Sequence, residues 1–416
     1  MHVTPRQPRR ILVVTPWADF WSMPGKAGVS DDAEFVRRAL AAGHTLHFVL
    51  PDGGRFDPAE LHPNLRLHPF PDVFARWRWL PTPLRRLVYM GWFLGPVVRR
   101  ARRVAAEVAP ELVLGFSYHG ARAAEVVGRE RGIPSAVKHF GVYTAAFFDR
   151  WPRWKYRYKN LETLYGLTRQ VDRLVILNDG TRGREAALHA GVPAGRVVQL
   201  LNGIHTEWAD LSLDRAAERA RLGAAPDDAV LLFLARLAPF KGTRQFMRVL
   251  PRLLADTPRP VSVLVAGSGE DEAWMREAAA RLPDADRVRF LGAVPHDDVP
   301  ALFAAADVFV TLNTYSNGSI PTCEAMVMGC PVLATDVAGT AEMVRDGVNG
   351  RLVPPDDDAA LLAALRELLA DDAARARLAA GARRWAAEHF DSWDQRVARE
   401  LDLIDALCAE GRTVGR

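Results

Sequence analysis

The stretch Val230-Leu-Leu-Phe-Leu-Ala-Arg236-Leu-Ala-Pro-Phe-Lys241-Gly242-Thr243 contains the unit from which this chain is built. Its apolar residues at 230–234 predict a buried strand, and the periodic pattern at 243–255 predicts a helix. A loop that carries an arginine and a lysine joins the two. Strands that alternate with helices in this way indicate a parallel sheet with both faces covered.

The same strand-and-helix unit recurs along the whole chain. In the first half, apolar runs predict strands at 11–14, 45–50, 112–115, 135–138, 174–177 and 197–200. In the second half, they predict strands at 230–234, 262–266, 288–291, 308–311 and 332–334. Helical patterns lie between these runs, for example at 31–42, 243–255 and 297–305, and a last amphipathic helix is expected at 385–407.

Two sets of strands predict two domains. The boundary is expected after Asn202-Gly203, where the strand-like stretch 197–200 gives way to a charged helical stretch at 214–222. We therefore expect an α/β protein with two doubly wound, Rossmann-like domains, one at 1–203 and the other at 204–389. Ligands of such sheets bind outside the carboxyl ends of the strands. The chemistry is accordingly expected in a cleft between the two domains.

The composition is that of a soluble globular protein. Of the 416 residues, 49% are apolar and 25% are charged, which excludes collagen-like, disordered and coiled-coil classes. The three cysteines cannot form a disulfide framework, so a reducing, cytoplasmic setting is favoured. No apolar run reaches the roughly 18 residues that a spanning helix needs, and the run after the basic start is too short for a secretory signal.

Basic and acidic residues are divided unevenly between the two halves. Residues 1–200 contain 30 Lys and Arg against 17 Asp and Glu, a balance of +13, and the remaining residues contain 24 against 33, a balance of −9. This asymmetry predicts two domains with different partners. Only 5 of the 54 basic residues are lysines, which indicates a codon bias toward arginine, so each lysine is more informative than an arginine.

Arg236 and Lys241 form the first candidate site. They lie five residues apart in the loop before the helix that begins at Gly242-Thr243. Two cations beside a helix N-terminus favour an anion such as phosphate. The alternative is that both are solvated loop cations.

The polar loop from Asn313 to Ser319 forms the second candidate site. A helix is expected from about Pro321, since proline is tolerated in a first turn. Glu324 is expected within that turn, where its carboxylate can accept hydrogen bonds from a diol. The alternative is a carboxylate that only opposes the helix dipole.

His139 directly follows the strand at 135–138, at the sheet edge where ligands bind. A capping or satisfied core histidine would occupy the same kind of position. No Cys/His cluster has the spacing of a zinc site, so no metal site is expected. Gly267-Ser-Gly269 follows a strand but lacks the third glycine of a dinucleotide fingerprint.

Several motifs together resemble glycosyltransferase family 4. The resemblance is strongest over residues 230–355 and extends more loosely over nearly the whole chain. The motifs of the second half are Arg236 with Lys241-Gly242, Val265-Ala-Gly-Ser-Gly269, Phe290-Leu-Gly292, the run from Glu324 to Asp336, and the run from Glu342 to Gly350. The looser motifs are the loop at 25–28, Ala42-Gly43-His44, His139-Phe-Gly141, Asn202-Gly203 and Phe390-Asp-Ser-Trp393.

This resemblance implies a reaction and the residues that carry it. It implies a GT-B fold and transfer of a hexosyl group, with retention, from a UDP- or GDP-linked sugar to an acceptor hydroxyl. Arg236 and Lys241 would hold the donor diphosphate, and Glu324 its ribose. His139 would contact the sugar or its phosphate. The further donor-binding residues that it implies are Ser316, Asn317, Gly318, Ser319, Ile320, Gly28 and Gly292.

Two further features follow from the resemblance. Fixed cations at the diphosphate stabilise the charge of the leaving group, so we expect no metal ion and no cofactor. The last helix, within 390–416, would cross back to the N-terminal domain.

The sequence departs from the family pattern at three positions. Ser316 stands where the family has the first of two glutamates, a residue that contacts the donor sugar, and a shift of one residue would put Asn317 there. His205 replaces a common aspartate, and Ala338 replaces a common glycine. The missing glutamate leaves the donor sugar open. It also leaves a catalytically inactive GT-B scaffold as an alternative to an enzyme.

Two basic and aromatic segments lie in the first half. Between Asp72 and Glu107 there are eight arginines and no acid, and the apolar stretch 87–98 lies between arginine pairs, as in an interfacial segment. The stretch 150–159 alternates five cations with Trp and Tyr. The residues that we assign to a membrane or acceptor surface are Trp151, Arg153, Trp154, Lys155, Arg85, Arg86 and Trp92.

These segments favour a lipid-linked or membrane-surface acceptor, in bacterial polysaccharide or glycolipid biosynthesis. The protein would then dock on the inner face of the cell membrane. A soluble natural-product acceptor and plainly solvated helical faces are the alternatives. Nucleic acid is not expected as a partner, because no recognition motif accompanies the charge.

Overall fold

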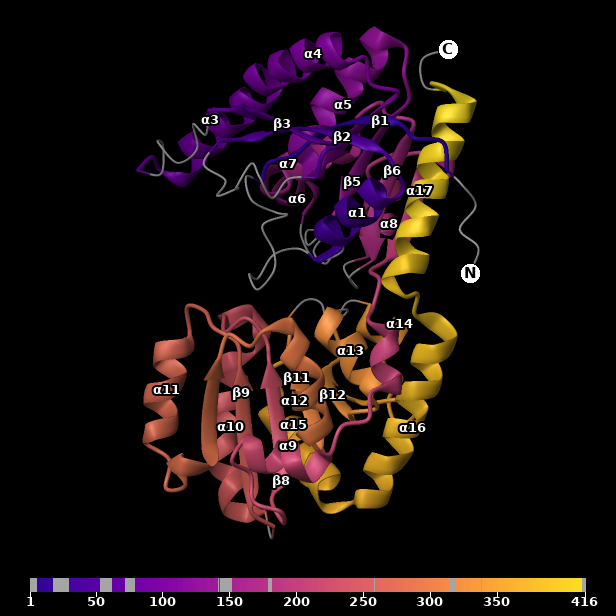
Figure 1. Ribbon diagram of the computed structural model, residues 1–416. Helices are drawn as coiled ribbons and strands as arrows, with labels where there is room; N and C mark the ends of the chain where they lie inside the picture. Colours follow the sequence, from indigo (N-terminus) through magenta and orange to yellow (C-terminus); the bar gives the residue numbers. More distant parts are fainter. Residues whose placement is uncertain are drawn as a thin grey trace. The chain divides into compact units, whose positions relative to one another are not determined.

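The computed structural model describes residues 6–17, 30–52, 62–71, 79–140, 142, 152–178, 182–257, 259–314, 319–337 and 339–413. The chain forms two compact units, each built on a parallel sheet (Figure 1). The first unit contains the chain up to Asn178, Arg182–Gly203 and the last helix from Trp393 onward, and the second contains Ile204–Ser392. The expected α/β class with two Rossmann-like domains is confirmed.

The first unit has a seven-stranded sheet in the order β3-β2-β1-β4-β5-β6-β7. Its strands are β1 Arg10–Val14, β2 Thr45–Pro51, β3 Leu65–Phe70, β4 Leu112–Phe116, β5 Ser135–His139, β6 Arg173–Asn178 and β7 Val197–Leu201. All neighbouring strands pair in parallel. The strand order reverses between β1 and β4, which is the kind of switch point where such sheets bind ligands.

Strand β3 was not predicted from the sequence. It forms the edge of the sheet, where Arg66 and Pro69 face outward, and its sequence therefore lacks the continuous apolar run of a central strand.

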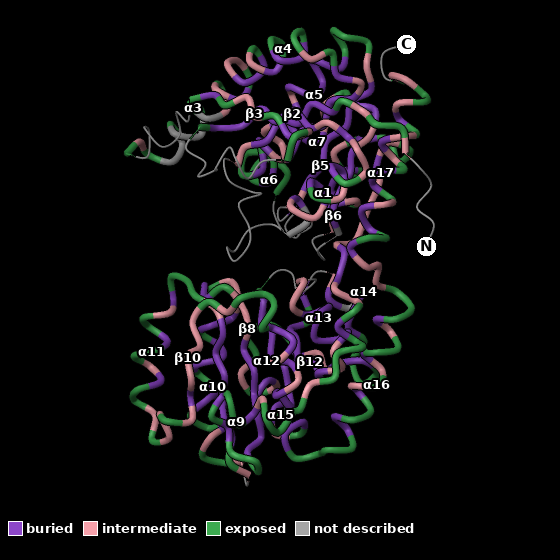
Figure 2. Tube along the Cα trace, in the orientation of Figure 1, coloured by how far each residue is buried: buried purple, intermediate pink, exposed green. Residues whose placement is uncertain are grey.

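Helices cover both faces of this sheet. They are α1 Ser30–Ala41, α3 Thr82–Leu94, α4 Pro96–Val108, α5 Ser117–Arg131, α6 Arg153–Lys159, α7 Leu161–Leu167, α8 Gly183–His189 and α17 Trp393–Glu410, with a 3₁₀ turn η3 Ala194–Arg196. Because successive strand residues point to opposite faces, Leu12 and Val14 join one buried cluster with α4 and α5. Ile11 and Val13 join a second cluster with α1 and α17 (Figure 2).

The second unit has a six-stranded parallel sheet in the order β10-β9-β8-β11-β12-β13. Its strands are β8 Ala229–Leu234, β9 Val261–Ala266, β10 Val288–Gly292, β11 Val308–Thr311, β12 Val332–Thr335 and β13 Arg351–Val353. Its helices are α9 Arg215–Arg221, α10 Thr243–Asp256, α11 Glu272–Ala280, α12 Val299–Ala305, α13 Ile320–Met328, α14 Thr340–Met343, α15 Asp358–Ala370 and α16 Asp372–His389. Its 3₁₀ turns are η4 Thr206–Asp210, η5 Pro239–Lys241, η6 Ala285–Arg287 and η7 His296–Asp298.

Two predicted continuous segments are each divided between two helices. The helix expected at 385–407 is broken between α16 and α17, because Ser392 pairs with Ile204 in a parallel bridge and the backbone there is extended. The apolar stretch 87–98 is broken at Gly95-Pro96, where α3 ends and α4 begins with the proline. The stretch therefore belongs to two helices, and its predicted place at a membrane interface stays a prediction.

A buried charge cluster fixes α17 to the first sheet. Lys138, near the carboxyl end of β5, is fully buried, and its Nζ lies 3.0 Å from Oε2 of Glu400 in α17. The same oxygen accepts a hydrogen bond from Nη1 of Arg396 at 2.9 Å, and Nε of Arg396 donates to the carbonyl of Leu201 at 2.7 Å. The Lys138 ammonium also lies 5.0 Å from the ring centre of Phe35 in α1. One carboxylate thus compensates two buried cations.

We predict that Glu400→Gln destabilises the first unit by about 3–5 kcal/mol, because it removes the charge of a carboxylate that pairs with two buried cations. The matched control is Asp402→Asn on the same helix, whose exposed ion pair with Arg6 contributes at most about 1 kcal/mol. The free energy of unfolding, measured by urea denaturation, checks both values. Equal losses in the two variants would contradict the assigned role of Glu400.

Candidate functional site

Loops from neighbouring strands meet at the carboxyl edge of the second sheet. The N–H of Gly267, directly after β9, donates to the carbonyl of Gly292, the last residue of β10, at 2.7 Å. The N–H of Leu237, after β8, donates to the carbonyl of Ser268 at 2.9 Å. These bonds hold the loops after β8, β9 and β10 against one another. Candidate donor-binding residues lie on these loops.

Glycines allow this close approach. Gly267 has φ +122°, and a Cβ there would lie 1.8 Å from the carbonyl oxygen of Ala235. Gly242 has φ +75°, and a Cβ there would lie 2.3 Å from the carbonyl oxygen of Leu312. Gly267-Ser-Gly269 is therefore explained by backbone packing between two loops.

Arg236 and Lys241 come together around one aromatic ring. The guanidinium of Arg236 lies 5.1 Å, and the ammonium of Lys241 5.4 Å, from the ring centre of Phe240. Lys241 ends the turn η5, and α10 begins two residues later at Thr243. Arg236 is exposed and Lys241 is half-buried. The two cations therefore stand together before the N-terminus of a 14-residue helix, which is an arrangement that binds anions.

Thr243 and Thr314 fix the backbone around these cations. The buried hydroxyl of Thr243 hydrogen-bonds to the carboxylate of Asp271 in the next loop. The N–H of Thr314, after β11, donates to the carbonyl of Phe240 at 2.9 Å. The loop between β8 and α10 is thus held from both sides.

Glu324 lies one turn deeper in its helix than predicted. Helix α13 begins at Ile320, so Glu324 falls in the second turn, and the prediction of a first-turn position is wrong. The residue is 1% exposed, and its Oε1 accepts a hydrogen bond from Nε2 of His296 at 2.8 Å. This bond raises the pKa of His296 above its ordinary value. The carboxylate therefore has a protein partner in the absence of ligand.

Two aromatic side chains pack on His296. Its ring centre lies 4.9 Å from that of Trp208 and 4.9 Å from that of His205, and His205 stacks on Trp208 at 5.1 Å. Sequence reasoning missed His296 and set His205 aside as a departure. The available signal was the position of His296 in the loop just after β10, at the same sheet edge as Glu324.

The other donor-binding predictions divide into two groups. Ser319 precedes the first residue of α13, Ile320, and its Oγ lies 2.9 Å from Oγ1 of Thr322. Gly292 lies at the same edge with φ +69°. The predictions that fall outside the described residues are Ser316, Asn317, Gly318 and Gly28.

His139 is the last residue of β5, at the carboxyl edge of the first sheet. It is buried, and burial lowers the pKa of His139 to about 4, so the imidazole is neutral at neutral pH. Its Nε2 has no hydrogen-bond partner among the described residues.

The predicted membrane or acceptor surface is exposed only in part. Trp79 and Leu87 are 73% and 68% exposed, and Trp154 in α6 is 72% exposed beside the exposed Arg153 and Lys155. Trp92 is instead half-buried and packs on Phe70, with ring centres 6.5 Å apart, so its assignment to a surface holds only in part. Trp151 and the side chains of Arg85 and Arg86 lie outside the described residues.

None of the helices that the structure describes is both long and apolar enough to cross a membrane. Within the same residues, no group of three His, Cys, Asp or Glu side chains is placed to hold a metal ion.

Residues 214–385 match the family model described as glycosyl transferases group 1. A D-inositol 3-phosphate glycosyltransferase of Geodermatophilus obscurus is 36% identical over 249 residues, which are 58% of this chain and 54% of the relative. Another, of Streptomyces bingchenggensis, is 33% identical over 241 residues, which are 56% of this chain and 52% of the relative. The chain thus spans about half the length of the curated relatives it matches.

Solved structures match over nearly the whole chain. HepE of Anabaena in complex with UDP superposes with a TM-score of 0.72 at 19% identity, over 96% of this chain and 100% of that one. Sucrose-phosphate synthase of Thermosynechococcus elongatus superposes with a TM-score of 0.75 at 20% identity, over 97% and 100%. Residues 214–385 therefore match the group 1 glycosyl transferases, and the chain as a whole has the GT-B fold.

Proposed function

We propose that this protein is a glycosyltransferase that moves a hexosyl group from a nucleotide diphosphate sugar to an acceptor hydroxyl, with retention, as in family 4. The observation that carries the proposal is the pairing of Arg236 and Lys241 before the N-terminus of α10, on the same sheet edge as Glu324. The match of residues 214–385 to group 1 glycosyl transferases supports it. So do structural neighbours solved with UDP and with UDP-glucose.

The two cations would act on the leaving group. The bond between the anomeric carbon and the phosphate oxygen breaks, and a bond from that carbon to the acceptor oxygen forms. The acceptor proton passes to the leaving phosphate. Arg236, Lys241 and the first N–H groups of α10 stabilise the charge that develops on the diphosphate. In this proposal no metal ion or other cofactor is required.

Glu324 would bind the ribose of the donor. A carboxylate has two oxygens that accept hydrogen bonds, and the diol of a ribose donates two. One oxygen is already bonded to His296, and the residue is almost fully buried. A ribose therefore reaches the carboxylate beside His296 or by replacing it.

His139 would contact the transferred sugar or its phosphate from the first unit. Because its pKa is lowered to about 4, the ring is a neutral hydrogen-bonding group during the reaction. Its Nε2, which lacks a partner among the described residues, is the atom that we assign to this contact.

The favoured acceptor is lipid-linked or lies at a membrane surface, in polysaccharide or glycolipid synthesis on the inner face of the cell membrane. The exposed Trp79, Leu84 and Leu87 around α3, in a stretch rich in arginine, support this choice. A soluble, phosphorylated polyol is the second candidate. It is favoured by the relatives named D-inositol 3-phosphate glycosyltransferase.

We predict that Lys241→Ala lowers the transfer rate by about 100-fold or more, because one donor to the developing charge is lost. The first step is a thermal-shift screen of UDP- and GDP-linked sugars, in which at least one should stabilise the wild-type protein. Arg252→Ala is the matched control. It removes an exposed cation near the other end of the same helix, so it should leave the initial rate within about twofold.

Two results would contradict this prediction. An unchanged rate in Lys241→Ala would remove its assigned role. The absence of any stabilising nucleotide sugar would refute the donor site and favour the inactive scaffold.

We predict that donor binding weakens as the pH falls and that His296→Ala abolishes this dependence. The hydrogen bond to Glu324 raises the pKa of His296, so the ion pair is complete at low pH and is lost as the pH rises through the raised pKa. A ribose that competes for Glu324 therefore binds better at high pH. Calorimetric titration with the selected nucleotide sugar between about pH 8 and pH 6 measures the effect. If donor affinity changes equally with pH in the wild type and in His296→Ala, competition between His296 and the ribose is contradicted.

We predict that the protein binds anionic phospholipid vesicles in a salt-sensitive manner, since each Lys or Arg near such a surface contributes about 1 kcal/mol. Leu87→Ser should reduce flotation with the vesicles, because an exposed apolar contact of α3 is lost. Leu188→Ser, an exposed leucine of α8, is the control and should have no effect. If the wild-type protein does not float with the vesicles, the soluble acceptor becomes the better candidate.

A further inference from the structure

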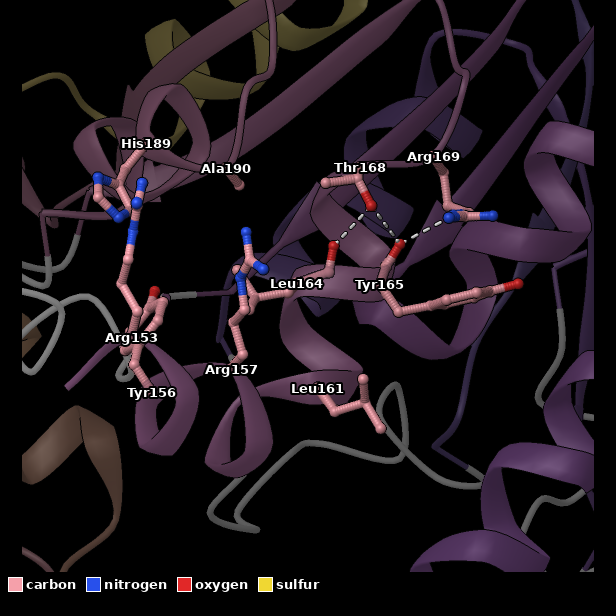
Figure 3. Close-up of a pocket in the computed structure, with 10 residues that line it drawn as sticks. All are labelled: Arg153, Tyr156, Arg157, Leu161, Leu164, Tyr165, Thr168, Arg169, His189 and Ala190. Carbon is pink, nitrogen blue, oxygen red and sulfur yellow. Dashed lines mark hydrogen bonds between the residues drawn. The ribbon is translucent and has the colours of Figure 1, made fainter. Parts of the chain in front are cut away.

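A cavity of about 330 Å³ lies in the first unit (Figure 3), whereas the loops of the candidate donor site belong to the second unit. Helices α6 and α7, the turn after α7 and the end of α8 line it. Its volume is in the range of pockets that hold small ligands. None of the proposed catalytic residues contributes to its lining.

The lining of this cavity is strongly basic. Arg153 and Arg157 of α6 and Arg169 after α7 contribute to it, together with His189, and no acidic residue occurs among the described lining residues. Arg153 and Arg157 lie four residues apart, so they share one face of the helix. Like charges at this spacing repel each other, and an anion between them would remove the repulsion.

Arg153 and Arg157 are available to a ligand. Both are exposed, and neither forms an ion pair with a carboxylate in the part of the chain that the structure describes. Figure 3 shows their side chains extending from α6 in the same direction, with the Arg153 guanidinium beside His189. The two guanidinium groups therefore form an open, cationic side of the cavity.

The opposite side is held in place by internal contacts. Nε of Arg169 donates to the carbonyl of Tyr165 at 2.8 Å, and its guanidinium lies 3.9 Å from the centre of the Tyr165 ring. Nη1 of Arg169 also lies 3.6 Å from Oε2 of Glu125. Arg169 is thus a supporting wall, while Leu161 and Leu164 add apolar surface for a carbon skeleton.

We infer that this cavity binds the phosphate group of a phosphorylated acceptor, with Arg153 and Arg157 as its ligands. The inference rests on the proposed glycosyl transfer, whose acceptor it describes. The planar guanidinium fork matches phosphate oxygens in a bidentate manner, and a phosphomonoester carries a charge of about −1.5 to −2 at neutral pH. The phosphate belongs either to a soluble polyol phosphate or to a phosphorylated lipid headgroup.

The first experiment measures binding of inorganic phosphate by calorimetric titration at constant ionic strength. Arg153→Ala and Arg157→Ala should each weaken binding by about tenfold, because each removes a charged hydrogen-bonding partner. Arg129→Ala is the matched control. It removes an exposed arginine of α5 in the same unit that does not line the cavity, so the affinity should stay within about twofold.

The same three variants also distinguish phosphate binding in the cavity from phosphate binding at the donor site. Arg236 and Lys241 are intact in all three, so phosphate bound by these two residues contributes equally to each measurement. A loss restricted to Arg153→Ala and Arg157→Ala supports the cavity. Equal affinities in all variants would overturn the inference.

The second experiment distinguishes the two sources of phosphate. A soluble source is indicated when inositol 1-phosphate binds with the same dependence on Arg157. The probe for a lipid source is a phosphatidylcholine vesicle that contains about 10% phosphatidylinositol 4-phosphate. A lipid source is indicated when this vesicle binds the wild type more strongly than it binds Arg157→Ala. Vesicles of phosphatidylcholine alone should then not bind the protein. Binding of neither probe would overturn the inference.

The failure of this inference and that of the proposed function are distinguishable. The thermal shift caused by a nucleotide sugar should be the same in Arg157→Ala and in the wild type. If the nucleotide sugar binds but no phosphate compound does, only the acceptor site is refuted. If phosphate compounds bind but no nucleotide sugar does, the transferase proposal fails.

Discussion

Parallel strand pairing is the constraint on which the arrangement of this protein depends. Every strand pair in the described part of both sheets is parallel, so each strand ends at the same edge as its neighbours. In the second unit this brings Arg236 and Lys241, Gly292, and Glu324 to one edge, although nearly 90 residues separate the first from the last. Hydrogen bonds between the loops then hold that edge in place.

Buried charges support this arrangement in different ways. Lys138 and Arg396 share the carboxylate of Glu400, and this cluster fixes the last helix to the first sheet. Glu324 is equally buried, but its partner His296 is half-exposed and lies among aromatic rings. The first cluster joins elements within a core, whereas the second joins a buried carboxylate to a partner that is partly exposed to solvent.

The placement of cations matters more than their number. The first half carries many arginines, and among the described residues the pair at 153 and 157 lines a cavity. The second half is acidic overall, and its one lysine stands at the helix N-terminus with Arg236. The scarcity of lysine drew attention to each lysine but did not indicate its role, because Lys241 lies at the candidate site while Lys138 lies in the core.

The sequence by itself determined most of the strand-and-helix order, the parallel sheets, the loop that carries Arg236 and Lys241, and the helix that carries Glu324, because apolar periodicity and glycine positions are local signals. It did not reveal the edge strands β3 and β13, whose partly exposed residues lack that signal, or the break between α16 and α17, which depends on pairing with Ile204. Only the tertiary structure decided that His296 binds Glu324, that Lys138 is structural and that Arg153 and Arg157 share a cavity with Arg169. Each of these contacts joins residues from different elements, and no local pattern encodes which elements meet.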